Sequence, residues 1–214
     1  KIMDEHLLRF DKDKLFVFLD FETENLCLNF VHNMPWQLAM IKSKGGKKID
    51  EKNYHIKWDR ELNVSPEAAK ITGFNKKKYE KLAEPYNELF PTINDWLSSA
   101  DYIVGHNILG FDVHLLKEYY RKMGVSDEHL LDKFLDTNAL AKGVKFGLPY
   151  NKGECLVEYQ FRAHNKRKKG VRTNLDALAK DYDIKYDKSK RHDALYDLEL
   201  NLMVWNKLKH NIEI

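Results

Sequence analysis

The most constraining feature of this 214-residue sequence is a short apolar run that ends in two acids. The segment KLFVFLDFE, residues 14–22, is rich in β-branched and aromatic side chains, which predicts a buried strand. Residues 35–44 and 53–58 also have strand character, and the turn signal GGKK lies between them. Three strands joined by short connections predict an antiparallel meander at the start of the fold.

Helical signals follow the meander and alternate with further strand signals. Ser65 and Pro66 predict a helix start and Gly73 a helix end, because serine caps helices, proline suits the first turn and glycine terminates helices. We expect strands at 101–107 and at the start of 133–143, the rest of which is helical. The other expected helices span 65–73, 85–100, 111–124, 173–184 and 192–210. This order predicts an α/β fold, with a mixed sheet flanked by helices.

Composition and the remaining segment limit the class of protein. Residues 143–173 lack clear periodicity, and we expect a basic loop or inserted hairpin there, within a single domain that spans residues 1–214. The two cysteines, Cys27 and Cys155, exclude a disulfide-rich scaffold and a cysteine-ligated zinc cluster, and they fit a reducing, cytoplasmic compartment. The sequence has no run of about 18 apolar residues, so it predicts no membrane span. The net charge of +3 does not by itself indicate a nucleic-acid partner.

The acids at the end of the first run are candidates for a metal site. Asp20 and Glu22 lie two residues apart, and side chains alternate across a strand, so both carboxylates point to one side. Like charges at the edge of a core repel each other, and a divalent cation between them would remove the repulsion. Oxygen ligands alone favour Mg²⁺ or Mn²⁺ over zinc. A solvated strand end is the alternative interpretation.

A third acid lies in the segment GHNILGFDVHLL. Asp112 falls near the start of the expected helix at 111–124, where the helix dipole favours a negative charge. A purely capping role is therefore the alternative to a role in a site. His106 and Asn107 add polar groups beside it.

The stretch RHDALYD carries a histidine and two further acids. His192 and Asp197 are five residues apart, which is about 140° around a helix, so they do not share a helical face. If both belong to one site, Asp197 lies on the helix and His192 lies on the loop before it. Asp193 shares the helical face of Asp197 and competes with it for the role.

Taken together, these segments resemble the motifs of the DEDDh family of 3′–5′ exonucleases. This ribonuclease H-like group includes the proofreading subunit of bacterial DNA polymerase III. The segments VSPEAAKITGF, LDTNALA and NLDALAKDYDI also resemble family segments, so the resemblance spans residues 14–208. Two details depart from the family pattern. The sequence after Glu22 reads TENLCLN, and the spacing from Asn107 to Phe111 is one residue longer than in many proofreading subunits.

The resemblance implies that two divalent ions, Mg²⁺ or Mn²⁺, serve the hydrolysis of terminal phosphodiester bonds, with release of nucleoside 5′-monophosphates. It implies that His192 acts as a general base. The metal ligands that it implies are Asp20, Glu22, Asp112 and Asp197. The substrate contacts that it implies near the terminal nucleotide are Thr23, Leu26, Asn107 and Phe111.

A basic run at residues 162–172, RAHNKRKKGVR, indicates how the rest of a strand could be held. Phosphate backbones attract such runs, although most short charge runs are only solvated loops. The contacts that we expect from it are Lys166, Arg167, Lys168 and Lys169. The expected substrate is the 3′ end of single-stranded DNA or RNA, with DNA favoured, since an end must thread into the site. The resemblance also raises a polymerase or another replication or repair protein as a partner.

Other functions stay open on the sequence alone. An exoribonuclease that trims RNA would carry the same motifs. A nucleic-acid-binding module with a weakened site would share the fold, but the presence of all four acids and the histidine argues against it. A hydrolase of small phosphoesters would use the same acids, but it would have no need of a long basic surface.

Overall fold

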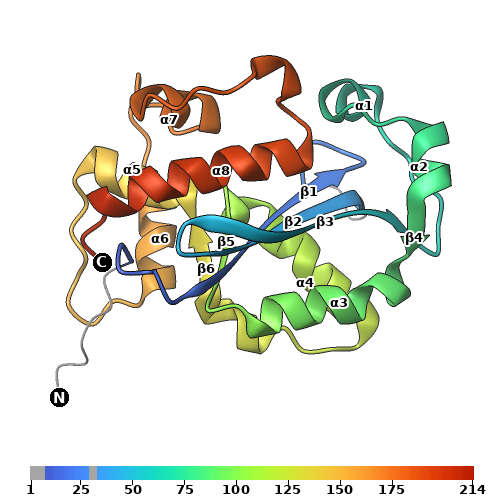
Figure 1. Ribbon diagram of the computed structural model, residues 1–214, viewed down its shortest axis with the longest axis horizontal. Helices are drawn as coiled ribbons and strands as arrows, with labels where there is room; N and C mark the ends of the chain where they lie inside the picture. The colour runs from blue at the N-terminus through green and yellow to red at the C-terminus, as the bar shows by residue number, and fades with distance from the viewer. Residues whose placement is uncertain (1–7, 29–32) are drawn as a thin grey trace.

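The computed structural model of the chain describes residues 8–28 and 33–214. Within these residues, one six-stranded sheet has the order β4-β3-β2-β1-β5-β6 (Figure 1). Strands β1, β2 and β3 pair antiparallel, whereas β5 and β6 run parallel to β1 and β4 runs parallel to β3. The prediction of a mixed sheet that begins with a meander is therefore confirmed. The strands are Leu15–Thr23 (β1), Pro35–Lys44 (β2), Lys47–Lys57 (β3), Ala83–Pro85 (β4), Tyr102–Gly105 (β5) and Phe134–Asp136 (β6).

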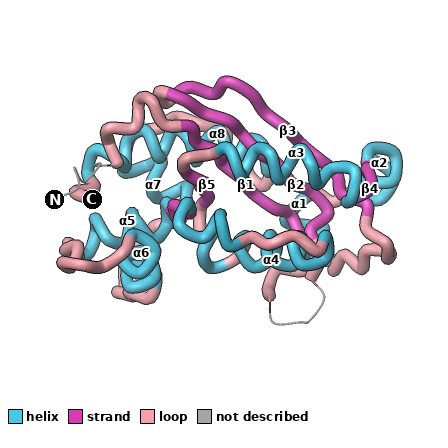
Figure 2. Tube along the Cα trace, turned by 90° about the horizontal axis from the view of Figure 1, so that it is seen from below, coloured by secondary structure: helices cyan, strands magenta, loops and turns pink. Residues whose placement is uncertain are grey.

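Helices cover both faces of this sheet (Figures 1 and 2). The α-helices are Pro66–Thr72 (α1), Lys76–Leu82 (α2), Tyr86–Ser99 (α3), Asp112–Met123 (α4), Thr137–Phe146 (α5), Leu156–His164 (α6), Leu175–Asp181 (α7) and Ala194–Leu208 (α8). Short 3-10 turns lie at Ile108–Gly110 (η1), Glu128–Lys133 (η2), Lys188–Lys190 (η3) and Lys209–Asn211 (η4). In the part of the chain that the structure describes, no helix combines the length and the hydrophobicity needed to cross a bilayer.

The alternation of side chains along β1 divides the core into two halves. Odd-numbered apolar residues from Val17 to Phe21 pack in the half that contains α3 and α4, and Phe16 and Phe18 pack in the half that contains α8. Asp20 and Glu22 continue the second row, so the strand points both carboxylates toward the side of α8. Burying the even row under α8 thus fixes where the acids lie.

The predicted helix signals act as expected at the ends of several helices. The hydroxyl of Ser65 accepts a hydrogen bond from the N–H of Ala68 at the start of α1, and Gly73 ends that helix with a φ of +70°. Helix α8 begins at Ala194, and its first turn contains Asp197. His192 therefore lies on the loop before the helix, as expected if it and Asp197 belong to one site.

The expectation of a loop or hairpin at 143–173 is wrong for the nine residues of α6. Cys155 and Glu158 form a capping box that starts this helix. Its inner face carries the fully buried Gln160, which donates to the carbonyl oxygen of Phe134 and accepts from the N–H of Asp136. The side chain of Gln160 thus satisfies backbone groups at the edge strand β6. Because a polar residue lies on the inner face of α6, an apolar stripe does not reveal this helix in the sequence.

The meander also extends further than its sequence pattern indicates. β3 begins at Lys47 rather than at residue 53, because a two-residue turn at Gly45 and Gly46, with φ of +59° and +75°, pairs Lys44 directly with Lys47. The first half of β3 is exposed, so it lacks apolar alternation. The short strand β4 and helix α2 were likewise not predicted.

Candidate active site

Four carboxylates from three elements meet at the C-terminal end of β1. Asp20 and Glu22 project from the strand, and Glu22 lies opposite Gln37 of β2. Asp112 is in the first turn of α4, and Asp197 is in the first turn of α8. Helices from opposite faces of the sheet thus direct their N-terminal turns at one strand end, and the structure brings together all four acids that the sequence singled out.

Asp112 is held firmly within this group. Its side chain is only 3% exposed, and its Oδ1 accepts a 3.0 Å hydrogen bond from the backbone N–H of Phe21. That N–H lies between Asp20 and Glu22 in the sequence, so the bond ties α4 to the acidic end of β1. Capping of α4 alone does not explain this cross-element bond.

The pKa values of the cluster show how strongly its acids interact. Burial raises the pKa of Asp20 well above its usual value, and the neighbouring charges of Glu22 and Asp112 raise it further. Burial, with Asp197 as the strongest charged neighbour, raises the pKa of Glu22 to about 8. Burial also raises the pKa of Asp112 to about 7, against the opposing effect of the bond from Phe21. Without a bound cation, the cluster therefore carries fewer negative charges at neutral pH than its composition indicates.

The donor set of the cluster suits a hard divalent cation. Its members are carboxylates, which are the ligands of Mg²⁺ and Mn²⁺. Oδ1 of Asp197 is buried within this cluster. In the present arrangement, however, no three His, Cys, Asp or Glu residues of the described chain converge in metal-ligand geometry. Arg191 is paired with Asp197 there.

His192 lies beside the cluster on the segment between η3 and α8. Its side chain is exposed, its φ is +72°, and its backbone N–H donates a 3.2 Å hydrogen bond to Oδ2 of Asp197. Positive φ values are uncommon for residues other than glycine and often mark functional sites. The competing acid Asp193 has a different task, because it caps α8 by accepting from the N–H of Tyr196.

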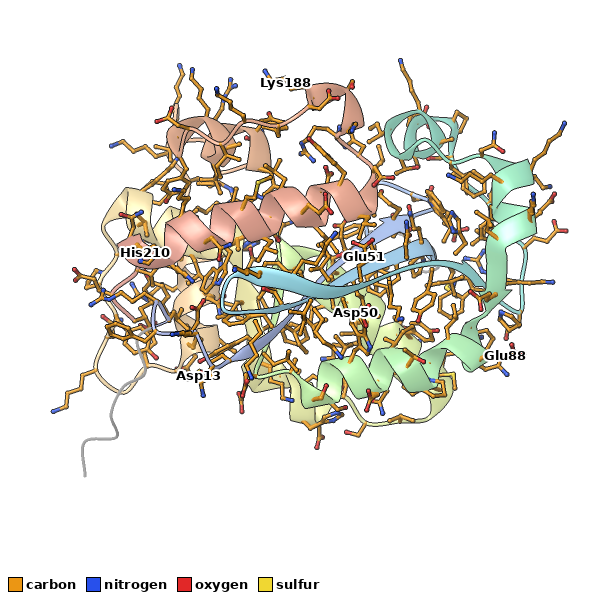
Figure 3. The ribbon with its side chains drawn as sticks, viewed as in Figure 1. Asp13, Asp50, Glu51, Glu88, Lys188 and His210 are labelled. Atoms are coloured by element: carbon orange, nitrogen blue, oxygen red, sulfur yellow. The ribbon has the colours of Figure 1, made fainter. Side chains whose placement is uncertain are left out.

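A polar cavity of about 320 Å³ adjoins His192. Residues 189–193 form one wall, and the end of α1 with the start of α2 forms another. Lys188, labelled in Figure 3, marks the neighbouring turn η3 on the side of α1. Trp36 lines the cavity from β2, and its buried Nε1 forms no hydrogen bond with a described residue. One residue of the cavity wall therefore carries a buried donor without a hydrogen-bond partner among the described residues.

The loop after Glu22 is braced by an acid that the sequence analysis did not single out. Glu24 is 2% exposed and accepts from the N–H groups of Met34 and Asn63, and it pairs with Arg60. Leu26, two residues further on, is 48% exposed, which leaves it free to contact a substrate. Thr23 is buried, and its hydroxyl donates to the carbonyl oxygen of Asn25. The side chain of Glu24 thus fixes the start of this loop.

The two residues predicted on the opposite side lie in the turn before α4. Asn107 has a φ of +67°, and its N–H donates to Asp136, a buried acid at the end of β6 that also accepts from Leu109. A Cβ on Gly110 would approach the side-chain oxygen of Asn107 to 2.6 Å, so a larger residue there would displace the side chain of Asn107. Phe111 packs partly buried against the core half of α3 and α4. The positions are thus fixed by packing, and their contact with substrate stays a prediction.

His106 is a further histidine near the site. Its Nδ1 is 2.9 Å from the hydroxyl of Thr137, and its buried Nε2 forms no hydrogen bond with a described residue. Burial lowers the pKa of this ring to about 4, so it is neutral at physiological pH. In the sequence it stands out only as a polar neighbour of Asp112, because nothing in its spacing distinguishes it from a packed core histidine.

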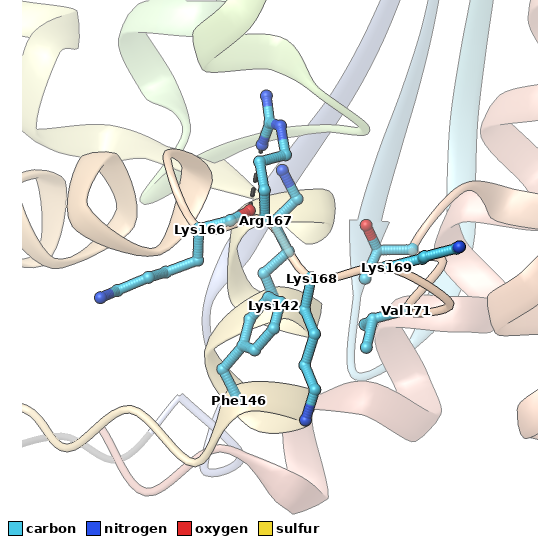
Figure 4. Close-up of a pocket in the computed structure, with 8 residues that line it drawn as sticks. Lys142, Phe146, Lys166, Arg167, Lys168, Lys169 and Val171 are labelled. Atoms are coloured by element: carbon cyan, nitrogen blue, oxygen red, sulfur yellow. Dashed lines mark hydrogen bonds between the residues drawn. The ribbon is translucent and has the colours of Figure 1, made fainter.

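The predicted basic contacts line a pocket to which none of the four acids contributes (Figure 4). Its volume is about 360 Å³, and no acid is among the described residues that line it. Lys142 and Arg167 converge on the carbonyl oxygen of His164, at 2.8 and 2.6 Å. The lining residues are Lys142, Phe146, Lys166, Arg167, Lys168, Lys169, Val171 and Thr173. The structure therefore adds α5 to the basic run that the sequence indicated.

Comparisons with known proteins identify the family. The family model RNase_T, described as Exonuclease, matches residues 17–204. No curated protein matches the chain in sequence. The zinc-bound complex of E. coli exonuclease I with single-stranded DNA has a TM-score of 0.70 at 19% identity, and exonuclease I from Methylocaldum szegediense has a TM-score of 0.69 at 19% identity. E. coli exonuclease I in complex with a dT13 oligonucleotide has a TM-score of 0.67 at 18% identity.

These similarities cover most of this chain but less than half of each neighbour. The E. coli structures align with 92% of this chain and the Methylocaldum structure with 89%, yet the aligned part is 39–41% of their own lengths. At such identity the likeness shows the fold, and the predicted ribonuclease H-like fold is confirmed. The family match contains all four acids and His192, and the chain belongs to the exonuclease family.

Proposed function

We propose that this chain is a 3′–5′ exonuclease of single-stranded nucleic acid, with DNA as its preferred substrate. The observation that carries the proposal is the meeting of Asp20, Glu22, Asp112 and Asp197 at one end of β1. The membership of the exonuclease family supports the reaction class. Similar E. coli structures contain single-stranded DNA, which favours DNA over RNA.

The four carboxylates would hold two divalent cations, Mg²⁺ or Mn²⁺. Two such ions, when bound, activate a water molecule and stabilise the leaving oxygen. Asp112 is preorganised for this task, since the N–H of Phe21 fixes its carboxylate before any ligand arrives. Asp20 and Glu22 would gain most from the cations, because burial makes their ionised forms costly otherwise.

His192 would act as the general base. The attacking water forms a bond to the terminal phosphorus, and His192 takes a proton from that water. The bond from phosphorus to the 3′ oxygen of the preceding nucleotide then breaks, this oxygen gains a proton, and a nucleoside 5′-monophosphate leaves. The exposed ring and the bond from its backbone to Asp197 keep His192 next to the reacting atoms while leaving its side chain free to move.

The strand beyond its last nucleotide would follow basic surface. Leu26 would pack against the terminal base, in line with its exposure on the braced loop. Phosphates further from the end would meet the pocket of Lys142 and residues 166–169. No acid is among the described residues that line that pocket, so none of them would repel a polyanion.

Digestion of end-labelled oligonucleotides tests the proposal. The protein should shorten a single-stranded DNA labelled at its 5′ end one nucleotide at a time, with Mn²⁺ and not with EDTA, and more slowly for matched RNA. Asp112→Asn serves as the control, because the amide keeps an acceptor for Phe21 but removes one ligand charge. Faster loss of RNA would indicate an exoribonuclease instead. Binding without any degradation would refute the proposed enzyme.

A further inference from the structure

Arg191 places a positive charge within the carboxylate cluster. Its side chain is 13% exposed, and its Nη1 forms an ion pair with Oδ1 of Asp197. Its Nε donates a 3.1 Å hydrogen bond to Oδ1 of Asp176 on α7, which also accepts from the hydroxyl of Tyr186. The side chain therefore bridges the cluster and a more exposed carboxylate outside it.

The inner contact of this bridge is an ion pair within the carboxylate cluster. Nη1 of Arg191 contacts Oδ1 of Asp197, and both side chains are largely buried. Contacts between a charged donor and a carboxylate are stronger than those between neutral groups. The guanidinium therefore occupies an oxygen of Asp197 that a metal ion would need.

Buried carboxylates need a compensating positive charge whenever they are ionised. Before metal binding, Arg191 is placed to supply part of it, through Asp197. A divalent cation that uses Oδ1 of Asp197 would meet Nη1 of Arg191 at the same atom. The two cations would repel each other at that distance, so they exclude each other.

We propose that Arg191 is a tethered counter-cation of the metal site, so that binding of a divalent metal requires Arg191 to leave Asp197. This inference rests on the proposed function, since it takes the cluster as the metal centre. Asp176 gives the displaced side chain a carboxylate to remain on. Arg191 thereby sets the metal affinity of the site.

The displacement also reaches His192. The N–H of His192 bonds to Oδ2 of Asp197, while the side chain of the preceding residue contacts Oδ1 of the same carboxylate. Two consecutive residues are thus attached to one metal ligand. Metal binding at Asp197 releases the first attachment and loosens the segment that carries the predicted general base.

Titration of the metal-free protein with Mn²⁺ alone tests this inference without measuring catalysis. Arg191→Gln removes the competing charge, and we expect its Kd for Mn²⁺, measured by calorimetry, to fall by about tenfold. Its melting temperature in EDTA should be lower than that of the wild type, because the cluster has lost its counter-charge. Mn²⁺ should therefore raise the melting temperature of this variant more than that of the wild type.

Lys190→Gln is the matched control, because it removes the same charge from the adjacent residue. Lys190 is exposed and lies over the ring of Tyr196, 5.8 Å from its centre, rather than within the cluster. We expect its Kd for Mn²⁺ to change less than about twofold. If Arg191→Gln does not fold, Arg191→Lys is tested instead. Lysine lacks the forked guanidinium that contacts both Asp176 and Asp197, so the Kd of this variant for Mn²⁺ should fall by a smaller factor.

The outcomes separate this inference from the proposed function. If the wild type binds Mn²⁺ and Arg191→Gln binds it no more tightly than Lys190→Gln does, the inference is refuted and the metal centre stands. Weaker binding by Arg191→Gln would also refute it, since Arg191 would then support the site. If none of the proteins binds Mn²⁺, the metal centre fails and the inference fails with it.

Discussion

Replacing Asp112 by asparagine should stabilise the metal-free protein in a pH-dependent manner. Burial raises the pKa of Asp112 from 3.8 to about 7, so the folded protein holds a proton that the unfolded chain has released. Stability that is present below the unfolded pKa is therefore lost as the pH rises through the folded pKa. Asparagine cannot ionise, so it avoids that loss, and its side-chain oxygen still accepts from Phe21.

The magnitude follows from the size of the shift. A change from 3.8 to about 7 corresponds to about 4 kcal/mol when the carboxylate is fully ionised. In the wild type, a neighbouring acid can take up the proton that Asp112 releases, so we expect a gain of about 2 to 4 kcal/mol for Asp112→Asn at about pH 8. For a domain of this length the gain is a rise in melting temperature of roughly 5 to 15 °C.

Urea unfolding in EDTA at about pH 8 and about pH 4 measures this gain. The gain should be large at the higher pH and small at the lower, where the folded acid is protonated and the unfolded acid is about half protonated. The buried His106, with its pKa of about 4, is common to both proteins, so its own pH effect cancels in the difference. A variant that is less stable than the wild type at about pH 8, or a gain that does not depend on pH, would refute the reasoning.

Three further changes address other parts of the account. His192→Ala should lower kcat on single-stranded DNA by about 10²–10⁴-fold while the Kd for Mn²⁺ stays close to that of the wild type; unchanged turnover at neutral pH would remove His192 from the mechanism. Exchanging Lys168 and Lys169 for glutamate should weaken the binding of long strands and make that binding less dependent on salt. The same exchange at the exposed Lys180 and Lys207 should have little effect, and equal losses of affinity would show that the pocket has no special role. Gln160→Leu should cost about 1–3 kcal/mol in urea unfolding, because it leaves the N–H of Asp136 without its acceptor, and an unchanged free energy would contradict the assigned role of α6.

Strand and helix geometry made part of the carboxylate cluster predictable, whereas the placing of Asp112 and Asp197 beside β1 came from the family resemblance. The alternation in β1 determines that Asp20 and Glu22 share a side, and the 140° between His192 and Asp197 separates loop from helix. Helix caps such as Ser65 and Gly73 are local for the same reason. These features depend on neighbours within a few residues, which is the range that a sequence pattern covers.

Contacts between distant residues lie outside that range. Gln160 finds its partners on β6, and Glu24 finds Arg60, 36 residues away. Polar residues with such partners have no periodicity to reveal them, so α6 was expected to be a loop or hairpin. Arg191 is a different case, because it lies only six residues before Asp197, but an arginine before a helix is ordinarily solvated and no pattern marks its pairing with that acid.

The most direct test of the central claim is anomalous diffraction from a crystal of the protein soaked in Mn²⁺. We expect two peaks about 3.5–4 Å apart between the carboxylates of β1, α4 and α8, with the Arg191 side chain no longer on Asp197. A cluster without a peak, or manganese bound only elsewhere on the surface, would contradict the proposed catalytic centre.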